Sequence, residues 1–162
     1  MLDIIKYGEP VLEKKAEPVG VFDDALSNLV RDMFAAMKRD RGIGLAAPQV
    51  ARSIRVFVTD VDEDGPRAFV NPEIVRTSPE EVDYEEGCLS FPGLYFVVKR
   101  PSAVQVRALD EKGKPFTLDA DGLLARVILH ENDHLDGKLF IDRVSKLKRE
   151  RALAHYRRLV NM

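Results

Sequence analysis

The 162-residue sequence has little of what secreted and membrane-spanning proteins need. It contains one cysteine, Cys88, so an intramolecular disulfide is excluded, as is typical of a reducing compartment. No apolar run approaches the roughly 20 residues that cross a bilayer. The apolar stretch at the amino end stops after Ile5, short of the roughly 7–15 residues in a signal-peptide core. These absences predict an intracellular protein with no membrane partner.

The sequence also lacks an excess of either charge. Lys and Arg number 25 against 27 Asp and Glu, giving a formal net charge of −2, so no nucleic-acid partner is predicted. We interpret the basic stretch at residues 146–151 as the solvated face of a helix. Apolar residues make up 45% and charged residues 32%, which is typical of a globular chain. The length suits one domain spanning residues 1–162.

Hydrophobic periodicity predicts helices near both ends of the chain and strands between them. The terminal helices are expected over residues 23–39 and from about residue 145 onward. Strands are expected at 54–60, 68–75, 95–99, 102–109 and 116–118, with a break at Asn71-Pro72. A further helix should begin near Asp119 or Asp121 and end at Asp136-Gly137. This order predicts an α+β fold of mostly antiparallel strands packed around that helix.

The predicted central helix carries His130, Glu131 and His134 in the pattern H-E-x-x-H. Residues four apart share a helix face, so both imidazoles can bind one metal ion. A bound metal lowers the pKa of water towards 7, and Glu131 can take the proton and deliver it to a leaving amine. The motif therefore predicts a metal-dependent amide hydrolase. The third histidine, His155, lies among arginines and is expected to be solvated.

A catalytic site of this kind usually has a third protein ligand. Some H-E-x-x-H peptidases place a histidine six residues after the second one, but here that position is Phe140, which cannot bind a metal. Glu150 is the only glutamate downstream, and Cys88 is the only thiol upstream. A thiolate is a strong soft ligand, so we favour Cys88. A metallopeptidase that uses Glu150 and cleaves internal peptide bonds stays open as the alternative.

Three segments of the sequence resemble the motifs of the peptide deformylase family, in the family's order. Gly42-Ile43-Gly44-Leu45-Ala46-Ala47-Pro48-Gln49 is similar to the first motif, and Glu86-Gly87-Cys88-Leu89-Ser90 to the second. His130 to His134, continuing into Leu135-Asp136-Gly137, is similar to the third. The resemblance extends from Ile5 to about Val144. It implies a hydrolase that removes the N-formyl group from the N-terminal methionine of newly synthesised proteins and releases formate.

The resemblance also implies roles for particular residues. Cys88, His130 and His134 would bind one divalent metal ion, natively Fe²⁺, with Zn²⁺, Ni²⁺ or Co²⁺ able to occupy the site. Glu131 would be the general acid and base, while the Gln49 side chain and the Leu89 backbone N–H would bind the oxygen that becomes negative. Gly44 would pair with the extended substrate. The methionine pocket would contain Ile43 together with Leu123 and Val127, for which ordinary core packing is an equally good interpretation.

Further expectations concern the surroundings of this site. Glu86 and Arg100 are expected to form an ion pair that supports the Cys88 segment. Tyr95 stands where some family members have an arginine near the substrate, so peptide contacts beyond the methionine stay open. The substrates would be N-formylmethionyl nascent peptides, with the ribosome exit region a plausible partner. Because the sequence starts on the domain without an Arg/Ser-rich transit peptide, a bacterial cytoplasmic enzyme is expected.

Overall fold

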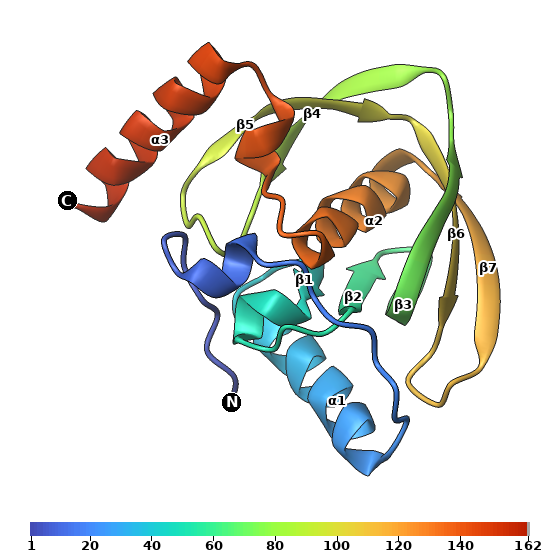
Figure 1. The fold of residues 1–162 in the computed structure, drawn as a ribbon. Helices are drawn as coiled ribbons and strands as arrows, with labels where there is room; N and C mark the ends of the chain where they lie inside the picture. Colours follow the sequence, from blue (N-terminus) through green and yellow to red (C-terminus); the bar gives the residue numbers. More distant parts are fainter. Residues whose placement is uncertain (162) are drawn as a thin grey trace.

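A computed structural model describes residues 1–161 of the chain (Figure 1). Its three α-helices are α1 (Asp24–Arg39), α2 (Gly122–Leu135) and α3 (Lys146–Val160). Short 3-10 turns occur at Pro10–Glu13, Ala47–Val50 and Phe140–Arg143. The strands are β1 (Gly44–Ala46), β2 (Val56–Val61), β3 (Gly65–Thr77), β4 (Glu81–Gly87), β5 (Tyr95–Pro101), β6 (Ala103–Leu109) and β7 (Pro115–Asp121).

The strands form two separate antiparallel sheets. Five of them pair in the order β1-β2-β3-β6-β7, while β4 and β5 pair with each other as a two-stranded sheet. The β3–β6 register shifts after Val70, where Asn71 has a left-handed backbone (φ 50) that its amide supports by bonding both to the N–H and to the C=O of Val19. The predicted interruption at Asn71 is therefore a local irregularity within one long strand.

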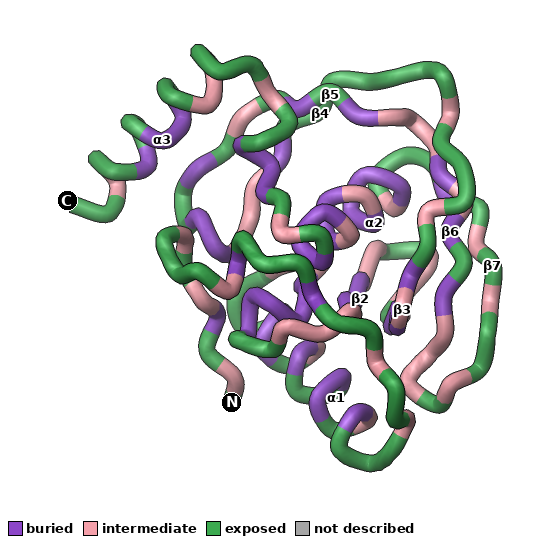
Figure 2. Tube along the Cα trace, viewed as in Figure 1, coloured by how far each residue is buried: buried purple, intermediate pink, exposed green. Residues whose placement is uncertain are grey.

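Helix α2 lies at the centre of the molecule, with strands on several sides and α1 and α3 farther out (Figure 1). Most of α2 is buried, whereas α3 is largely exposed (Figure 2). The inner face of the five-stranded sheet packs on α2 through Phe57, Phe69, Val106 and Ile128. A charged helix segment can stay buried here only if each polar side chain has a partner. The buried polar side chains of α2 therefore need hydrogen-bond or ion-pair partners within the fold.

The predicted α+β architecture around a central helix is confirmed, and the local signals explain most of its elements. Asp23 and Ser145 cap α1 and α3 by accepting bonds from the backbone N–H groups of Leu26 and Lys148. Helix α2 follows Asp121, whose side chain makes no capping bond, and Gly137 (φ 71) ends it. Asp119, the other proposed helix start, lies inside β7.

The sequence did not predict β1 or β4. Strand β4 has the sequence EVDYEEG, in which only Val82 and Tyr84 alternate with acidic residues of low strand propensity, and most of the strand is exposed. Strand β1 has three residues, which is too short for a periodic signal. Within residues 1–161, no helix has both the length and the apolar character needed to cross a membrane.

Candidate metal centre and cleft

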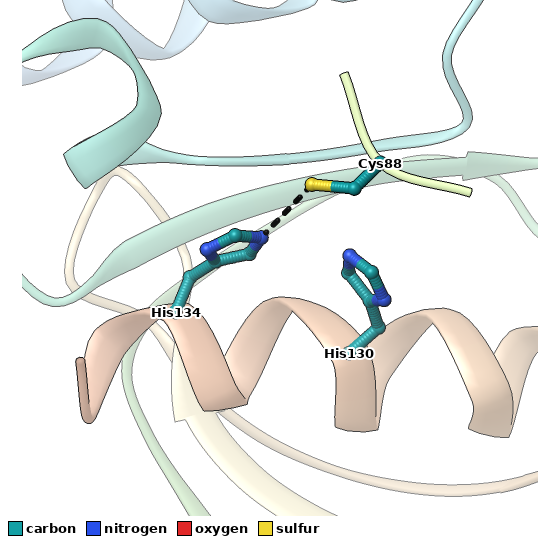
Figure 3. Close-up of side chains that lie close together, drawn as sticks. All are labelled: Cys88, His130 and His134. Atoms are coloured by element: carbon teal, nitrogen blue, oxygen red, sulfur yellow. Dashed lines mark hydrogen bonds between the residues drawn. The ribbon is translucent and has the colours of Figure 1, made fainter. Parts of the chain in front are cut away.

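Cys88, His130 and His134 come together although Cys88 is more than forty residues away along the chain. Their potential ligand atoms all lie within 4.8 Å of one another, and both histidines are buried (Figure 3). The Cys88 Sγ lies 3.5 Å from the His134 Nε2. A thiolate and two imidazoles at this spacing fit a tetrahedral metal site with room for a fourth ligand. This cluster is the one group of three possible ligands found in the described part of the chain.

The two histidines are placed by α2, and Cys88 by the end of β4. His130 and His134 are one helical turn apart and project toward the same side, where the Cys88 side chain approaches from the opposite direction (Figure 3). Burial lowers the pKa of His134 to about 3, which keeps its imidazole neutral and able to bind a metal. Phe140, the failed ligand position, is buried with its ring 5.6 Å from that of His130.

Glu86 is the shared carboxylate partner of several buried charged side chains. One carboxylate oxygen lies 2.8 Å from the His130 Nδ1, which leaves the other ring nitrogen for the ligand cluster. Arg100 donates two bonds to Glu86, at 2.6 and 3.1 Å, so the predicted ion pair is present. Arg126 donates a further bond of 2.7 Å. Burial alone would raise the pKa of Glu86, but the bonds from His130 and Arg100 outweigh it and lower the pKa well below the usual range.

Asp133 extends this network along α2. It accepts a bond of 2.9 Å from Arg100 and two bonds, of 2.9 and 2.6 Å, from Arg143. Burial would raise the pKa of Asp133, yet the bonds from Arg143 and Arg100 lower it. Arg100 therefore connects the segment before Cys88 to the helix that carries the histidines. Its two carboxylate partners come from separate elements of the fold.

Glu131 is buried beside the cluster. Burial raises its pKa to about 7, close to the value that suits a group exchanging protons at neutral pH. Its Oε1 atom is buried and has no hydrogen-bond partner among residues 1–161. A Cβ on Gly44 would lie 2.6 Å from the Glu131 Oε2 and 2.7 Å from the Val127 Cγ1. Only glycine lets β1 approach the glutamate this closely.

Gln49 is buried where β1 meets the Cys88 segment. Its side-chain oxygen accepts a bond from the Ala46 N–H, and its Nε2 lies 3.6 Å from the Cys88 Sγ and 3.1 Å from the Ser90 Oγ. Ser90 in turn donates to the Ile5 carbonyl at 2.6 Å. The amide orientation is therefore fixed, with its N–H₂ group turned toward Cys88. Leu89 lies between these residues and also borders the cleft.

A cleft of about 790 Å³ opens onto the centre. One wall comes from the end of α1 and from β1, and the other from β4, β5 and the segment after Cys88. The cleft is lined by the residues predicted to act on substrate, namely Ile43, Gly44, Gln49, Leu89, Leu123, Val127 and Glu131. Ile43 and Leu123 are among the exposed large hydrophobic side chains of the protein. An exposed apolar surface next to polar groups is typical of a ligand site.

No role was predicted from the sequence for two residues of this site. Arg126 is buried at the base of the β4–β5 wall, and Ser90 is the fully buried partner of Gln49. Arg126 lies four residues before His130, so helical spacing offered a weak signal for it. Glu150, the alternative ligand, is exposed on α3 and does not belong to the cluster. Tyr95 is exposed at the cleft, where its ring covers Gly87.

Comparison with known proteins gives one consistent family. Residues 1–150 match the family model described as Polypeptide deformylase. A peptide deformylase of Treponema pallidum (strain Nichols) is 53% identical over 149 residues, covering 92% of this chain and 91% of the relative. The crystal structure of a Legionella pneumophila peptide deformylase superposes with a TM-score of 0.90 at 45% identity, covering 99% and 98% of the two chains.

A second solved structure agrees with the first. The peptide deformylase from Thermus thermophilus superposes with a TM-score of 0.92 at 42% identity, covering 97% of this chain and 93% of that one. These similarities extend over the histidine helix, both sheets and the cleft. They favour deformylation over the cleavage of internal peptide bonds.

Proposed function

The chain belongs to the peptide deformylase family, metal-dependent hydrolases that remove the N-formyl group from nascent chains, and we propose that Cys88, His130 and His134 are its metal ligands. The observation that carries this assignment is the convergence of these three side chains beside Glu131 at the cleft. The donor set fits a divalent ion, because a buried neutral imidazole and a thiol have their ligand atoms 3.5 Å apart, a separation that suits two ligands of one tetrahedral ion. Glu86 would hold His130 in the ring orientation that binding needs.

Glu131 is proposed as the general acid and base. When bound, the metal supplies polarisation of the formyl carbonyl and a lowered pKa for the attacking water. Glu131 takes the proton as the water oxygen bonds to the formyl carbon, and delivers it to the nitrogen as the C–N bond breaks. The products are formate and a peptide with a free amino group. The pKa of about 7 matches a group that must both accept and release this proton.

Gln49 and Leu89 are proposed to stabilise the oxygen that becomes negative when water attacks. The Gln49 amide is held by the Ala46 N–H and Ser90, and its Nε2 lies 3.6 Å from the Cys88 Sγ, beside the proposed ligands. The backbone N–H of Leu89 would be the second donor, and it follows Cys88 directly. One such donor is typically worth about 3–4 kcal/mol of barrier.

Strand β1 is proposed to bind the substrate backbone. The Ile43 carbonyl accepts from the Asp60 N–H on the β2 side, so strand alternation turns the polar groups of Gly44 toward the cleft. An extended peptide can then pair with this edge. Ile43, Leu123 and Val127 would receive the methionine side chain.

Three wider assignments complete the proposal. We infer that residues 1–162 form one catalytic domain, since the family model matches nearly all of them. Fe²⁺ is proposed as the native ion, with Zn²⁺, Ni²⁺ or Co²⁺ able to occupy the same ligands. The family's action on nascent chains supports a bacterial cytoplasmic location near the ribosome exit.

The test is formate release from formyl-Met-Ala-Ser under anaerobic conditions, with the protein loaded with iron or nickel. Cys88→Ala should lose the metal, measured by elemental analysis after gel filtration, and with it activity. Glu150→Ala is the matched control and should keep both. Cleavage of internal peptide bonds without formate release, together with metal loss in Glu150→Ala, would overturn the assignment.

A further inference from the structure

The β4–β5 sheet forms one wall of the cleft. Backbone bonds connect it to the five-stranded sheet at the end where β4 begins and β5 ends, from the Ser78 N–H to the Ala103 carbonyl and from the Ser102 N–H to the Glu80 carbonyl. Strands β4 and β5 pair with each other through seven residue pairs, from Glu81↔Pro101 to Gly87↔Tyr95. No strand of the larger sheet pairs with either of them in the described chain. Away from that end, the position of this wall relative to α2 therefore depends on side chains.

Arg126 on α2 reaches both strands of this wall. Its Nη1 donates to the Val98 carbonyl of β5 at 2.7 Å, and its Nη2 donates to the Val82 carbonyl of β4 at 2.8 Å. The guanidinium carbon lies 5.7 Å from the centre of the Tyr84 ring, a cation–π contact on the cleft side. The residue is 5% exposed, so these bonds form in a largely desolvated setting.

The same guanidinium also contacts the network behind the metal ligands. Its Nη1 lies 2.7 Å from one Glu86 oxygen, while the other Glu86 oxygen bonds to the His130 Nδ1. Arg126 and His130 are one turn apart on α2, so both groups address Glu86 from the same helix face. One side chain thus connects the cleft wall, the carboxylate and the helix.

We propose that Arg126 is a positioning residue that sets the distance between the β4–β5 wall and α2 and, through Glu86, supports the orientation of His130. This inference rests on the proposed site roles. It assigns Arg126 two separable effects: one on the width of the substrate cleft, and one on metal retention. Arginine suits the position because its planar group reaches three acceptors in different directions.

Lysine separates the two effects. In Arg126→Lys, one ammonium can still neutralise Glu86, but it cannot also span the carbonyls of β4 and β5. We expect metal retention close to that of the wild type and a KM for formyl-Met-Ala-Ser raised roughly tenfold, the equivalent of one lost bond to a charged group. In Arg126→Met, the metal should also dissociate roughly ten- to a hundredfold faster.

Arg55 provides a matched control. It holds the opposite end of α2, donating to the Leu135 carbonyl at 2.8 Å and to Asp136 at 3.0 Å, and it does not line the cleft. Arg55→Met should lower the thermal stability while leaving KM and metal retention unchanged. A purely structural role for Arg126 would make the two methionine variants behave alike.

The decisive experiment combines hydrogen exchange with kinetics on the metal-loaded enzyme. In the Arg126 variants, amides of β4 and β5 should exchange faster, while those of β6 and β7 keep their wild-type rates. Unchanged β4–β5 exchange, or a wild-type KM in Arg126→Lys, would overturn the proposal. Hydrogen exchange needs no turnover, so it tests the position of the β4–β5 wall independently of activity. Absence of formate release by the wild type would instead count against the proposed site roles. If Arg126→Met does not fold, Arg126→Lys alone decides.

Discussion

The two walls of the cleft are held in place by different forces. Strand β1 is paired by its backbone to β2, and its own Leu45 and Ala46 side chains are fully buried in apolar clusters. The β4–β5 wall is mostly exposed, and charged groups around Glu86 tie it to α2. Backbone pairing and apolar packing tolerate the loss of one polar group, whereas a buried charge network does not. Substitutions in the two walls should therefore fail in different ways.

The largest effect is expected for Glu86→Ala. The change leaves Arg100 and Arg126 buried without their shared carboxylate, so the free energy of unfolding should fall by about 3–5 kcal/mol. Urea unfolding of the metal-loaded protein measures this. Glu85→Ala, the exposed neighbour on the same strand, is the control and should change stability by less than about 0.5 kcal/mol. Equal effects of the two variants would contradict the charged-wall interpretation.

Gly44→Ala, in the β1 wall, should lower the catalytic rate more than the stability. The new Cβ would press on the Glu131 carboxylate and on Val127, displacing the proposed acid and base. We expect kcat/KM for formate release to fall roughly a hundredfold, because small misplacements at the reacting groups cost about that much. Metal content should stay at the wild-type level.

Gly20→Ala is the control for this change, since a Cβ there meets no atom within 4 Å. It should leave kcat/KM unaltered. Wild-type turnover in Gly44→Ala would show that β1 and Glu131 are not held as closely as the geometry indicates.

Arg100→Ala should have an intermediate effect. Glu86 keeps Arg126 and His130, and Asp133 keeps Arg143, so neither carboxylate is left alone. Loss of the bonds to charged groups should lower the free energy of unfolding by about 1.5–3 kcal/mol. Metal retention should fall roughly tenfold, measured by competition with a chelator. Unchanged metal retention and activity would show that Arg100 does not support the Cys88 segment.

The smallest effect is expected for Lys99→Ala on the outer face of the same hairpin. The Lys99 Nζ lies 3.7 Å from the Asp83 Oδ1, and both side chains are about 60% exposed. Such a pair contributes less than about 0.5 kcal/mol, because water and salt screen it. Thermal unfolding at low and high salt checks this. A loss of stability comparable to that in Arg100→Ala would mean that burial does not explain the difference between the Lys99–Asp83 and Arg100–Glu86 pairs.

Much of the site was predictable because it lies in short motifs. His130, Glu131 and His134 follow from helical spacing, and Cys88 from its being the only thiol. The terminal helices and most strands followed from periodicity. Strand β4 and the role of Arg126 did not. The alternation in β4 is limited to Val82 and Tyr84 among acidic residues of low strand propensity, and an arginine in a helix usually faces solvent.

The sequence by itself determined the H-E-x-x-H helix, the two terminal helices and five of the strands, since each depends on residues close together along the chain. The tertiary structure decided which distant groups meet. It brought Cys88 to the histidines and Gly44 against Glu131, and it gave Glu86 three donors from two elements. The physical reason is that burying charge on α2 requires partners, and only the folded chain determines which elements supply them.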